Sequence, residues 1–441
     1  KELSYIISNK NKGARKKRGG TPNEMYRSIT FRVYRCLYEG CLPPPPPTVP
    51  VGRPMDFLRW SSEEDWASLD LTKPVAGADG VVEEWVSIPP GVWMVMDENP
   101  PLLSRMYIYG VLEIDDVMDM TLSAEIIMIQ GDLAQLVAGY ADEPYQNNFE
   151  LILRGNHYTP DQPLPNGPNL GAKALGVFGK LQMHGKDVGT TWTRLAEDAA
   201  VGSNTIVLSE EVDPLYWSAG AEIIIAPTGF EPLESEKMTI ESIDGNTITL
   251  TESLMYEHLG SEYSAGDKSW KIAAEVGLLT RNIKIVGEEY DEIGEEEFGA
   301  RVLVAEFMQE GTTYKGYAKF SNVEFVRAGQ EGWVDAFDPR YGLAFVNHGE
   351  STDNDENNKE SYVKKCAFNY NYNAAIGVFG SDNILIEDNV VFRTLEYGLR
   401  DEGVGNRWIH NMIVLTRFVG IHKNHRQNFF KRGCFNFLEA L

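Results

Sequence analysis

The chain has 441 residues, of which 43% are hydrophobic, so it is long enough for several domains and too apolar to be disordered throughout. Its formal net charge of −25 disfavours general nucleic-acid binding, and it disfavours tight binding of polyanionic glycans outside a local basic patch. The sequence contains no run of about 18 apolar residues, so no membrane contact is predicted within it.

Residues 1–54 are predicted to form a tail and a proline-rich linker. A basic run at 10–18 is typical of a solvated tail, with a nuclear or anion-binding role as the alternative. Consecutive prolines at 43–47 favour a stiff polyproline II spacer, which marks a domain boundary. Cys36 and Cys41 lie close enough in sequence to form a small disulfide loop in an oxidising compartment.

Short apolar segments, each interrupted by a glycine, follow between Met106 and Gly185. Their isoleucine, valine, tyrosine and phenylalanine content favours strands, and a glycine inside a strand marks a bend or a close backbone approach. The glycines are separated by 21, 24 and 24 residues, and such a repeat indicates stacked coils of a parallel β-helix. We therefore assign a structural role to Gly110, Gly131, Gly155 and Gly179, and we expect parallel strands at Ile108, Ile127, Leu151 and Val177.

The pattern changes after the glycine-marked coils. Residues 201–256 alternate apolar and polar side chains over short stretches, and Asp244-Gly-Asn246 is a strong hairpin turn. We predict a small antiparallel β unit inserted at 186–272. This unit should add no coil to the stack, and Ile223 and Ile248 should lie outside the core of the β-helix.

The coil pattern resumes over 273–421. Asn322, Cys366, Asn389 and Asn411 form a second set of positions, separated by 44, 23 and 22 residues. We interpret the first gap as two coils and each of the others as one coil. Asparagine at a repeated bend tolerates a left-handed backbone and can bond to the next coil, so its role here is structural. We therefore assign a structural role to Asn389 and Asn411.

The end of the chain, 422–441, loses the repeat and is predicted to be irregular. It is interpreted either as a capping segment or as a foreign end. His422 and His425 have metal-ligand spacing but lie in this tail, so we predict no metal site.

The loop that contains Asp338-Pro-Arg340 holds the richest local cluster of chemically reactive groups in the sequence, and we take these groups as candidates for ligand binding. Two carboxylates about 5–10 Å apart across a groove could act as an acid/base pair on a glycan. The Asp-Pro step could equally initiate a turn, with the arginine paired to a carboxylate. We favour a structural or binding role, assign no catalytic residue and expect no cofactor. The candidates are Asp335, Asp338, Arg340 and His348.

Several motifs occur in the order in which they occur in a known family. They resemble the G-eight domain and the following β-helix of fibrocystin and fibrocystin-L, over roughly residues 55–420. The motifs include Ile88-Pro-Pro-Gly91, Tyr109-Gly-Val-Leu-Glu-Ile114, Leu153-Arg-Gly-Asn-His157, Gly167-Pro-Asn-Leu-Gly171, Leu175-Gly-Val-Phe-Gly179, Trp192-Thr-Arg-Leu195, Asp338-Pro-Arg-Tyr341 and Ala374-Ala-Ile-Gly-Val-Phe379.

The resemblance implies part of a larger receptor-like protein, either anchored at the plasma or ciliary membrane or secreted. The first residue is Lys1 rather than Met, and we expect the chain to be a piece of a longer protein. A related branch that degrades hyaluronan carries paired histidines on one coil. The stretch that aligns with them, 340–348, retains only His348, so the resemblance does not extend to that pair.

The sequence thus predicts an all-β protein, a right-handed parallel β-helix with a small antiparallel insert. Its parts are 1–54, a G-eight domain at 55–185, the insert at 186–272, β-helix repeats at 273–421 and the tail at 422–441. The expected function is a non-enzymatic surface module for adhesion, ligand binding or coat formation. Its expected partner is an extracellular glycan or protein. The alternative is an enzyme that depolymerises a hyaluronan-type polysaccharide.

Overall fold

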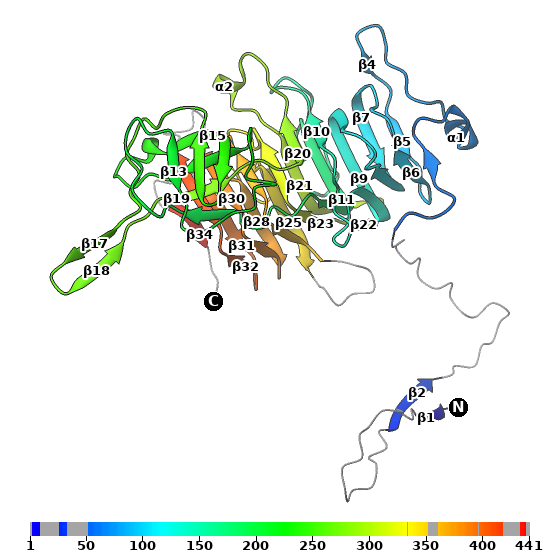
Figure 1. The fold of residues 1–441 in the computed structure, drawn as a ribbon. Coiled ribbons are helices and arrows are strands. Elements are labelled where there is room, and N and C mark those ends of the chain that lie inside the picture. Colours follow the sequence, from blue (N-terminus) through cyan, green and yellow to red (C-terminus); the bar gives the residue numbers. More distant parts are fainter. Residues whose placement is uncertain are drawn as a thin grey trace, which may run out of the picture. The chain divides into compact units, whose positions relative to one another are not determined.

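A computed structural model describes residues 2–8, 26–32, 52–332, 334–351, 360–395, 397–417 and 433–437 (Figure 1). Two compact units are separated at residue 48. In the first unit, β1 (Glu2–Ser8) pairs antiparallel with β2 (Tyr26–Arg32). The Cys36–Cys41 disulfide and the proline spacer were predicted in segments that lie outside the described residues.

The second unit is a parallel β-helix, which confirms the predicted fold class. Each coil contributes a strand to each of three parallel sheets, here named sheets one, two and three. Three long strands bend from one sheet to the next: β7 (Leu102–Ile108), β9 (Met120–Ala138) and β11 (Ala174–His184).

Each of the other strands of the β-helix belongs to only one of the three sheets. Sheet one contains β4 (Val81–Val82), β10 (Phe149–Leu153), β20 (Ile283–Gly287), β24 (Val323–Val326), β27 (Ala367–Asn369), β30 (Val390–Leu395) and β33 (Met412–Arg417). Sheet two contains β5 (Val86–Ile88), β21 (Arg301–Gln309), β25 (Leu343–Glu350), β28 (Ile376–Asp382), β31 (Tyr397–Glu402) and β34 (Gly433–Phe437). Sheet three contains β3 (Leu58–Arg59), β6 (Trp93–Met96), β8 (Val111–Ile114), β23 (Tyr317–Ser321), β26 (Tyr362–Lys364), β29 (Leu385–Glu387) and β32 (Arg407–Ile409).

The first coil is covered by α1 (Glu63–Ser68). The Ser62 side chain accepts a hydrogen bond from the Asp65 amide at 3.1 Å, which caps the helix N-terminus. Trp66 donates its indole N–H to the Trp60 carbonyl at 2.8 Å, and the two rings meet edge to face at 5.0 Å. Both rings are buried in the β-helix core, so α1 shields that end of the core from water.

The predicted glycine repeat is correct at three of its four positions. Gly110, Gly131 and Gly179 lie at the same bend, between sheets two and three, and a Cβ on Gly179 would lie 2.9 Å from the Gly131 carbonyl oxygen. Gly155 instead follows β10, in sheet one, where its φ of +119° requires glycine. The equal spacing is therefore wrong at Gly155, because one coil is enlarged by a loop between β10 and β11.

The strands predicted to be parallel are parallel, but they do not form one column. Ile108 and Val177 both pair with Ile129, and Ile127 pairs with Met106. Leu151 pairs with Leu122 in sheet one, because β10 stacks on the first part of β9.

The asparagine positions form a ladder across coils, as expected for a structural role. Asn389 accepts a hydrogen bond from the Cys366 amide at 2.8 Å and donates to the Val363 carbonyl at 2.9 Å. It also donates to Asn411 at 2.8 Å. The interpretation of the gap of 44 residues between Asn322 and Cys366 as two coils is wrong. Asn322 lies one coil before Lys365, the neighbour of Cys366, and the loops on either side of β25 supply the extra residues.

The antiparallel insert has a core of its own. A six-stranded sheet has the order β12 (Trp192–Arg194), β19 (Glu275–Leu278), β14 (Glu222–Ile225), β15 (Glu236–Asp244), β16 (Thr247–Leu250) and β13 (Thr205–Val207). Ile223 and Ile248 are buried in this separate core. Because Val276 and Leu278 of β19 also lie in it, the insert ends after 278, not at 272, and the β-helix resumes at β20.

Five short elements remain. The hairpin of β17 (Glu262–Ala265) and β18 (Lys268–Lys271) extends from the insert, and β22 (Thr312–Lys315) folds back on β21. The short helices η1 (Pro232–Glu234) and α2 (Ile293–Glu296) lie in loops. No helix among the described residues is long and apolar enough to cross a membrane.

The tail predicted to be irregular contains a strand. Residues 433–437 form β34, which pairs in parallel with β31 and so continues sheet two. The apolar positions within Gly433-Cys-Phe-Asn-Phe437 suit a strand, although the long gap after β33 hides the repeat in the sequence.

The bend glycines provide a test of coil packing. A Cβ on Gly110 would meet the carbonyl oxygens of Pro89 and Val92, which are backbone atoms and cannot rotate away. We expect Gly110→Ala to lower the free energy of unfolding by about 2–3 kcal/mol. Gly294→Ala is the matched control, because its Cβ would meet nothing within 4 Å, and it should be neutral or slightly stabilising. Equal stability of the two variants in chemical denaturation would contradict this packing.

Candidate ligand-binding site

The outward residues of sheet one form three rows that run from coil to coil across β9, β10, β20 and β24. In rows one and two, register places the members side by side on neighbouring strands, about 4.8 Å apart. Row one is Thr121, Glu150, Lys284 and Glu324. Row two is Ser123, Ile152, Val286 and Val326. Row three, at the bend where the strands end, is Arg154, Glu288 and Arg327.

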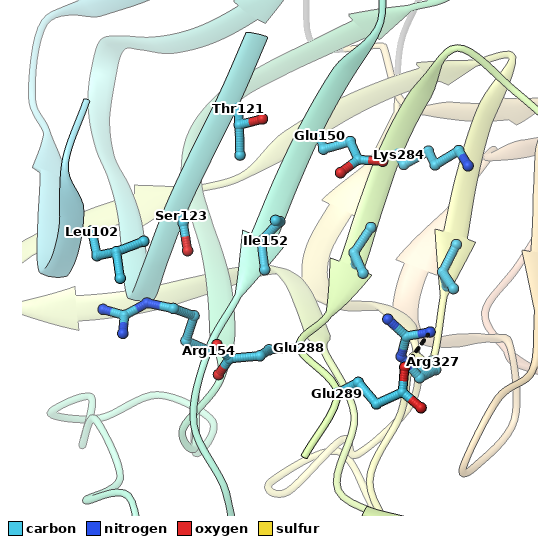
Figure 2. A pocket seen from close by; sticks show the side chains of 12 residues that line it. Leu102, Thr121, Ser123, Glu150, Ile152, Arg154, Lys284, Glu288, Glu289 and Arg327 are labelled. Carbon is cyan, nitrogen blue, oxygen red and sulfur yellow. Dashed lines mark ion pairs between the residues drawn. The ribbon is translucent and has the colours of Figure 1, made fainter. Parts of the chain in front are cut away.

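All members of these rows except the buried Glu324 line an open groove of about 470 Å³, shown in Figure 2. The middle row is apolar in three of its four positions, and Ile152, Val286 and Val326 are half-buried rather than covered. Charged side chains lie on both sides of it. The groove therefore presents an apolar stripe between two rows of hydrogen-bonding groups.

Row one alternates in charge along the coils. The Lys284 ammonium lies 3.6 Å from the Glu324 carboxylate, and Glu150 lies on the other side of Lys284. Glu324 is 2% exposed and accepts hydrogen bonds from the Arg281 amide and from Asn369. Burial raises the pKa of Glu324, so this carboxylate depends on its polar partners to remain ionised.

Row three is braced by backbone contacts. Arg154 donates to the Leu103 carbonyl at 2.8 Å, and Arg327 donates to the Gly287 carbonyl at 2.9 Å. Glu289, beside this row, pairs with Arg327 at 3.7 Å (Figure 2). The buried Lys173 ammonium donates to the Glu288 carbonyl at 2.6 Å, and burial lowers the pKa of Lys173 to about 8. The bonds to main-chain carbonyls hold the Arg154 and Arg327 side chains in place, and Lys173 holds the main chain at Glu288.

The insert limits the groove at one end. Its apolar residues Ile224 and Ala226 pack on the outward side chains of β27, β30 and β33, and they cover the later coils of sheet one. Glu222 of the insert accepts a hydrogen bond from Asn369 at 3.1 Å, and Asn369 also donates to Glu324. The uncovered part of sheet one is thus confined to the coils before β27.

Three of the four candidate residues from the sequence lie together in one loop, with structural contacts. Asp338 pairs with Arg301 at 3.1 Å and with Arg340 at 2.8 Å, and Arg301 is 1% exposed. Asp335 accepts hydrogen bonds from the amides of Phe337 and Asp338, which form a turn. These contacts satisfy the carboxylates of Asp335 and Asp338.

His348 does not share this cluster's contacts. It is 1% exposed on β25 and packs against the rings of Tyr317 and Phe345, and neither ring nitrogen has a hydrogen-bond partner among the described residues. Burial lowers the pKa of His348 to about 4, so the ring is neutral at pH 7. Among the residues that the structure describes, no group of three His, Cys, Asp or Glu side chains could hold a metal ion.

The groove residues were not predicted from the sequence. The alternation in Phe149-Glu-Leu-Ile-Leu-Arg154 and Ile283-Lys-Ile-Val286 shows which side chains point outward. It does not show that β10 and β20, separated by more than a hundred residues, lie side by side.

Comparison with known families matches two segments. Residues 78–196 match the G8 domain, and residues 297–434 match the CEMIP beta-helix. The chain therefore combines a G8 domain with a parallel β-helix of this type.

Similarity to individual proteins extends over most of the chain. It is 39% identical to human fibrocystin-L and 38% to the mouse protein over 90% of its length, and 29% identical to dog fibrocystin over 84%. The resemblance to the fibrocystin and fibrocystin-L family is thus confirmed. The chain spans only about a tenth of the length of these relatives.

Solved structures give weaker matches. Tailspikes of an Acinetobacter baumannii bacteriophage and of Pseudomonas phage LKA1 align at 11% and 13% identity, with TM-scores of 0.19 and 0.18. They cover 67% and 79% of this chain, and 47% and 52% of their own. A likeness at this level supports no argument about function.

The orphaned imidazole of His348 predicts a pH dependence. Histidine in the unfolded chain is protonated below its pKa of about 6.5, whereas the buried ring of His348 stays neutral down to about pH 4. The free energy of unfolding therefore decreases as the pH is lowered from about 6.5 to about 4. The loss attributable to His348 is about 2 kcal/mol at pH 5. We expect His348→Leu to be neutral or stabilising at pH 7 and to lose less stability at pH 5, as measured by denaturation of the whole chain.

His184 serves as the comparison for this prediction. Its pKa is also lowered to about 4 by burial, but its ring bonds to the Tyr362 hydroxyl at 2.7 Å and the Gly139 carbonyl at 3.2 Å. His184→Leu should therefore destabilise the protein already at pH 7. If His348→Leu loses as much stability on acidification as the wild type, the assignment of the titrating group is wrong.

Proposed function

We propose that the chain is a non-enzymatic carbohydrate-binding module of a larger cell-surface protein, and that the groove on sheet one binds the glycan. The observation that carries this proposal is the half-buried apolar row flanked by two rows of charged side chains (Figure 2). A pyranose ring has apolar C–H faces and a rim of hydroxyls. Such a ring can lie on Ile152 and Val286 while its hydroxyls bond to the charged groups on either side.

A glycan suits the floor of this groove better than a peptide strand does. Each floor strand is bonded to neighbours on both sides, β10 to β9 and β20, and β20 to β10 and β24. No backbone groups are left for a peptide to add as a further strand. Only side chains can make contacts, and side chains repeated once per coil suit a ligand that also repeats.

The charges of the groove favour a neutral glycan. Three carboxylates, Glu150, Glu288 and Glu289, are balanced by three cations, and the buried Glu324 adds a further negative charge. The chain as a whole carries a formal charge of −25. A polyanion such as hyaluronan would gain no net attraction here and would be repelled at longer range.

The similarity to fibrocystin-L supports a location on the extracellular face of the plasma or ciliary membrane, with the membrane anchor elsewhere in the parent protein. Adhesion or formation of a surface coat through glycans is the role that fits this location. Neither nucleic acid nor a cofactor takes part in the proposed function.

Depolymerisation of a hyaluronan-type polysaccharide is the second candidate, because residues 297–434 match the CEMIP beta-helix. The coil that aligns with the paired histidines of the degrading branch presents Ala344 and Val346, both buried in an apolar cluster. The one remaining imidazole, His348, is buried in the core. Among the described residues of the aligned stretch 340–348, no exposed imidazole is therefore available as a proton shuttle.

Binding can be tested by titrating the whole chain against a panel of neutral oligosaccharides. We expect Glu150→Ala and Lys284→Gln each to weaken binding about tenfold, since each removes a hydrogen-bonding group beside the apolar row. The control variants Arg194→Ala and Glu275→Ala break an exposed ion pair on the insert and should bind as the wild type does. Unchanged affinity in both groove variants would exclude the groove as the binding site.

Activity can be tested by incubating the chain with hyaluronan over a range of pH, with and without calcium. We expect the chain length of hyaluronan on a gel to remain unchanged. Depolymerisation that disappears in a joint Asp335→Ala, Asp338→Ala variant would overturn the non-enzymatic proposal and make that loop the active site. A variant of the groove carboxylate, Glu150→Gln, tests the other location.

A further inference from the structure

The first coils of sheet two carry a group of aromatic side chains on their outer face, here named the aromatic platform: Trp85, Tyr107 and Tyr109. The Trp85 and Tyr107 ring centroids lie 5.1 Å apart, and Tyr107 and Tyr109 are stacked at 6.1 Å with an angle of 8° between their planes. Further along sheet two the outer face is covered by Leu164 and Leu170 of the loop between β10 and β11. Tyr107 is buried in the same cluster as these leucines and Tyr109 is partly buried against it, whereas Trp85 remains exposed beside them.

Strand register explains why these rings meet. Val86 pairs with Met106, so Trp85 lies beside Arg105, and Ser87 lies beside Tyr107. Because the side chain of Ser87 is small, the indole of Trp85 can extend past it and contact the Tyr107 ring. Because Trp85 directly precedes β5, the coil fixes its backbone.

Polar contacts hold the platform rigid. The Arg105 guanidinium lies 5.5 Å from the Trp85 ring centroid, in a cation–π arrangement. Arg105 donates to the side-chain Oε1 of Gln162 at 2.5 Å, and the Tyr107 hydroxyl donates to the same atom at 3.3 Å. Trp85 is therefore ordered on two neighbours, and a ligand that uses its ring loses little side-chain entropy on binding.

The platform combines order with exposure. Trp85 is 63% exposed, although an indole is among the side chains that gain most from burial. Within the part of the chain that the structure describes, no hydrogen bond is made by the Trp85 indole N–H or the Tyr109 hydroxyl. An exposed ring with unused polar edges suits a ligand that offers both an apolar face and hydroxyl groups.

We propose that the aromatic platform is a second carbohydrate-binding site, which takes the apolar face of a neutral pyranose ring on Trp85. Sugar C–H groups carry a small positive charge and are attracted to the negative face of an aromatic ring. A protein partner is disfavoured, because three rings offer far less than the roughly 800 Å² per partner of a stable interface.

This site lies on sheet two and is separate from the groove on sheet one, so it can be tested separately. The experiment titrates the whole chain with cellohexaose, chitohexaose and mannohexaose, and it follows both affinity and tryptophan fluorescence. We expect Trp85→Ala to weaken binding of at least one of these at least tenfold, and Trp85→Phe to retain affinity within about threefold. Trp270→Ala is the matched control, because Trp270 is also exposed, at 45%, but lies on the β17–β18 hairpin.

The outcomes distinguish the two sites. Loss of binding in Trp85→Ala with normal binding in Trp270→Ala supports the platform, and normal binding in Glu150→Ala would then count against the groove alone. Normal binding in Trp85→Ala with loss in Glu150→Ala overturns the platform and leaves the groove as the binding site. Equal loss in Trp85→Ala and Trp270→Ala also overturns it, because the effect would then not be specific to the platform. If the wild type binds none of these sugars, both sites are excluded as sites for neutral glycans.

Discussion

Hydrogen bonding between successive coils is the constraint on which the other features depend. In a parallel β-helix each strand bonds to the coil before it and the coil after it, so the register of one coil fixes the next. Side chains at equivalent positions then fall into rows that run from coil to coil. The three rows of the groove and the rings of the aromatic platform both result from this rule.

The fold could be predicted because its signals are local and repeat. Strand-forming residues, glycines at bends and asparagine at left-handed positions mark each coil, and the Asp244-Gly-Asn246 turn marks the insert. Counting coils failed where loops lengthen a coil, as at Gly155 and between Asn322 and Cys366. A repeat read from spacing alone cannot distinguish two short coils from one coil that carries a long loop.

The candidate site was harder to predict. The sequence shows Asp335, Asp338 and Arg340 close together. It does not show that the Asp338 carboxylate already forms an ion pair with the buried guanidinium of Arg301. The groove residues come from strands far apart in the chain, because the insert lies between β10 and β20. Their common feature is a position in the coil, which becomes visible only when the coils are aligned.

The insert has a consequence for the kind of ligand that the groove can accept. Because it covers sheet one from β27 onward, a chain lying along the apolar row meets a wall after Lys284 and Glu324. At the other end the row runs out past Ser123 to the partly exposed Leu102. A long polymer could not lie across such a surface, but its terminus could enter. The number of binding sites would then equal the number of glycan chain ends. A surface with short or branched glycans would therefore offer more binding sites than one that carries the same mass of glycan in long unbranched chains.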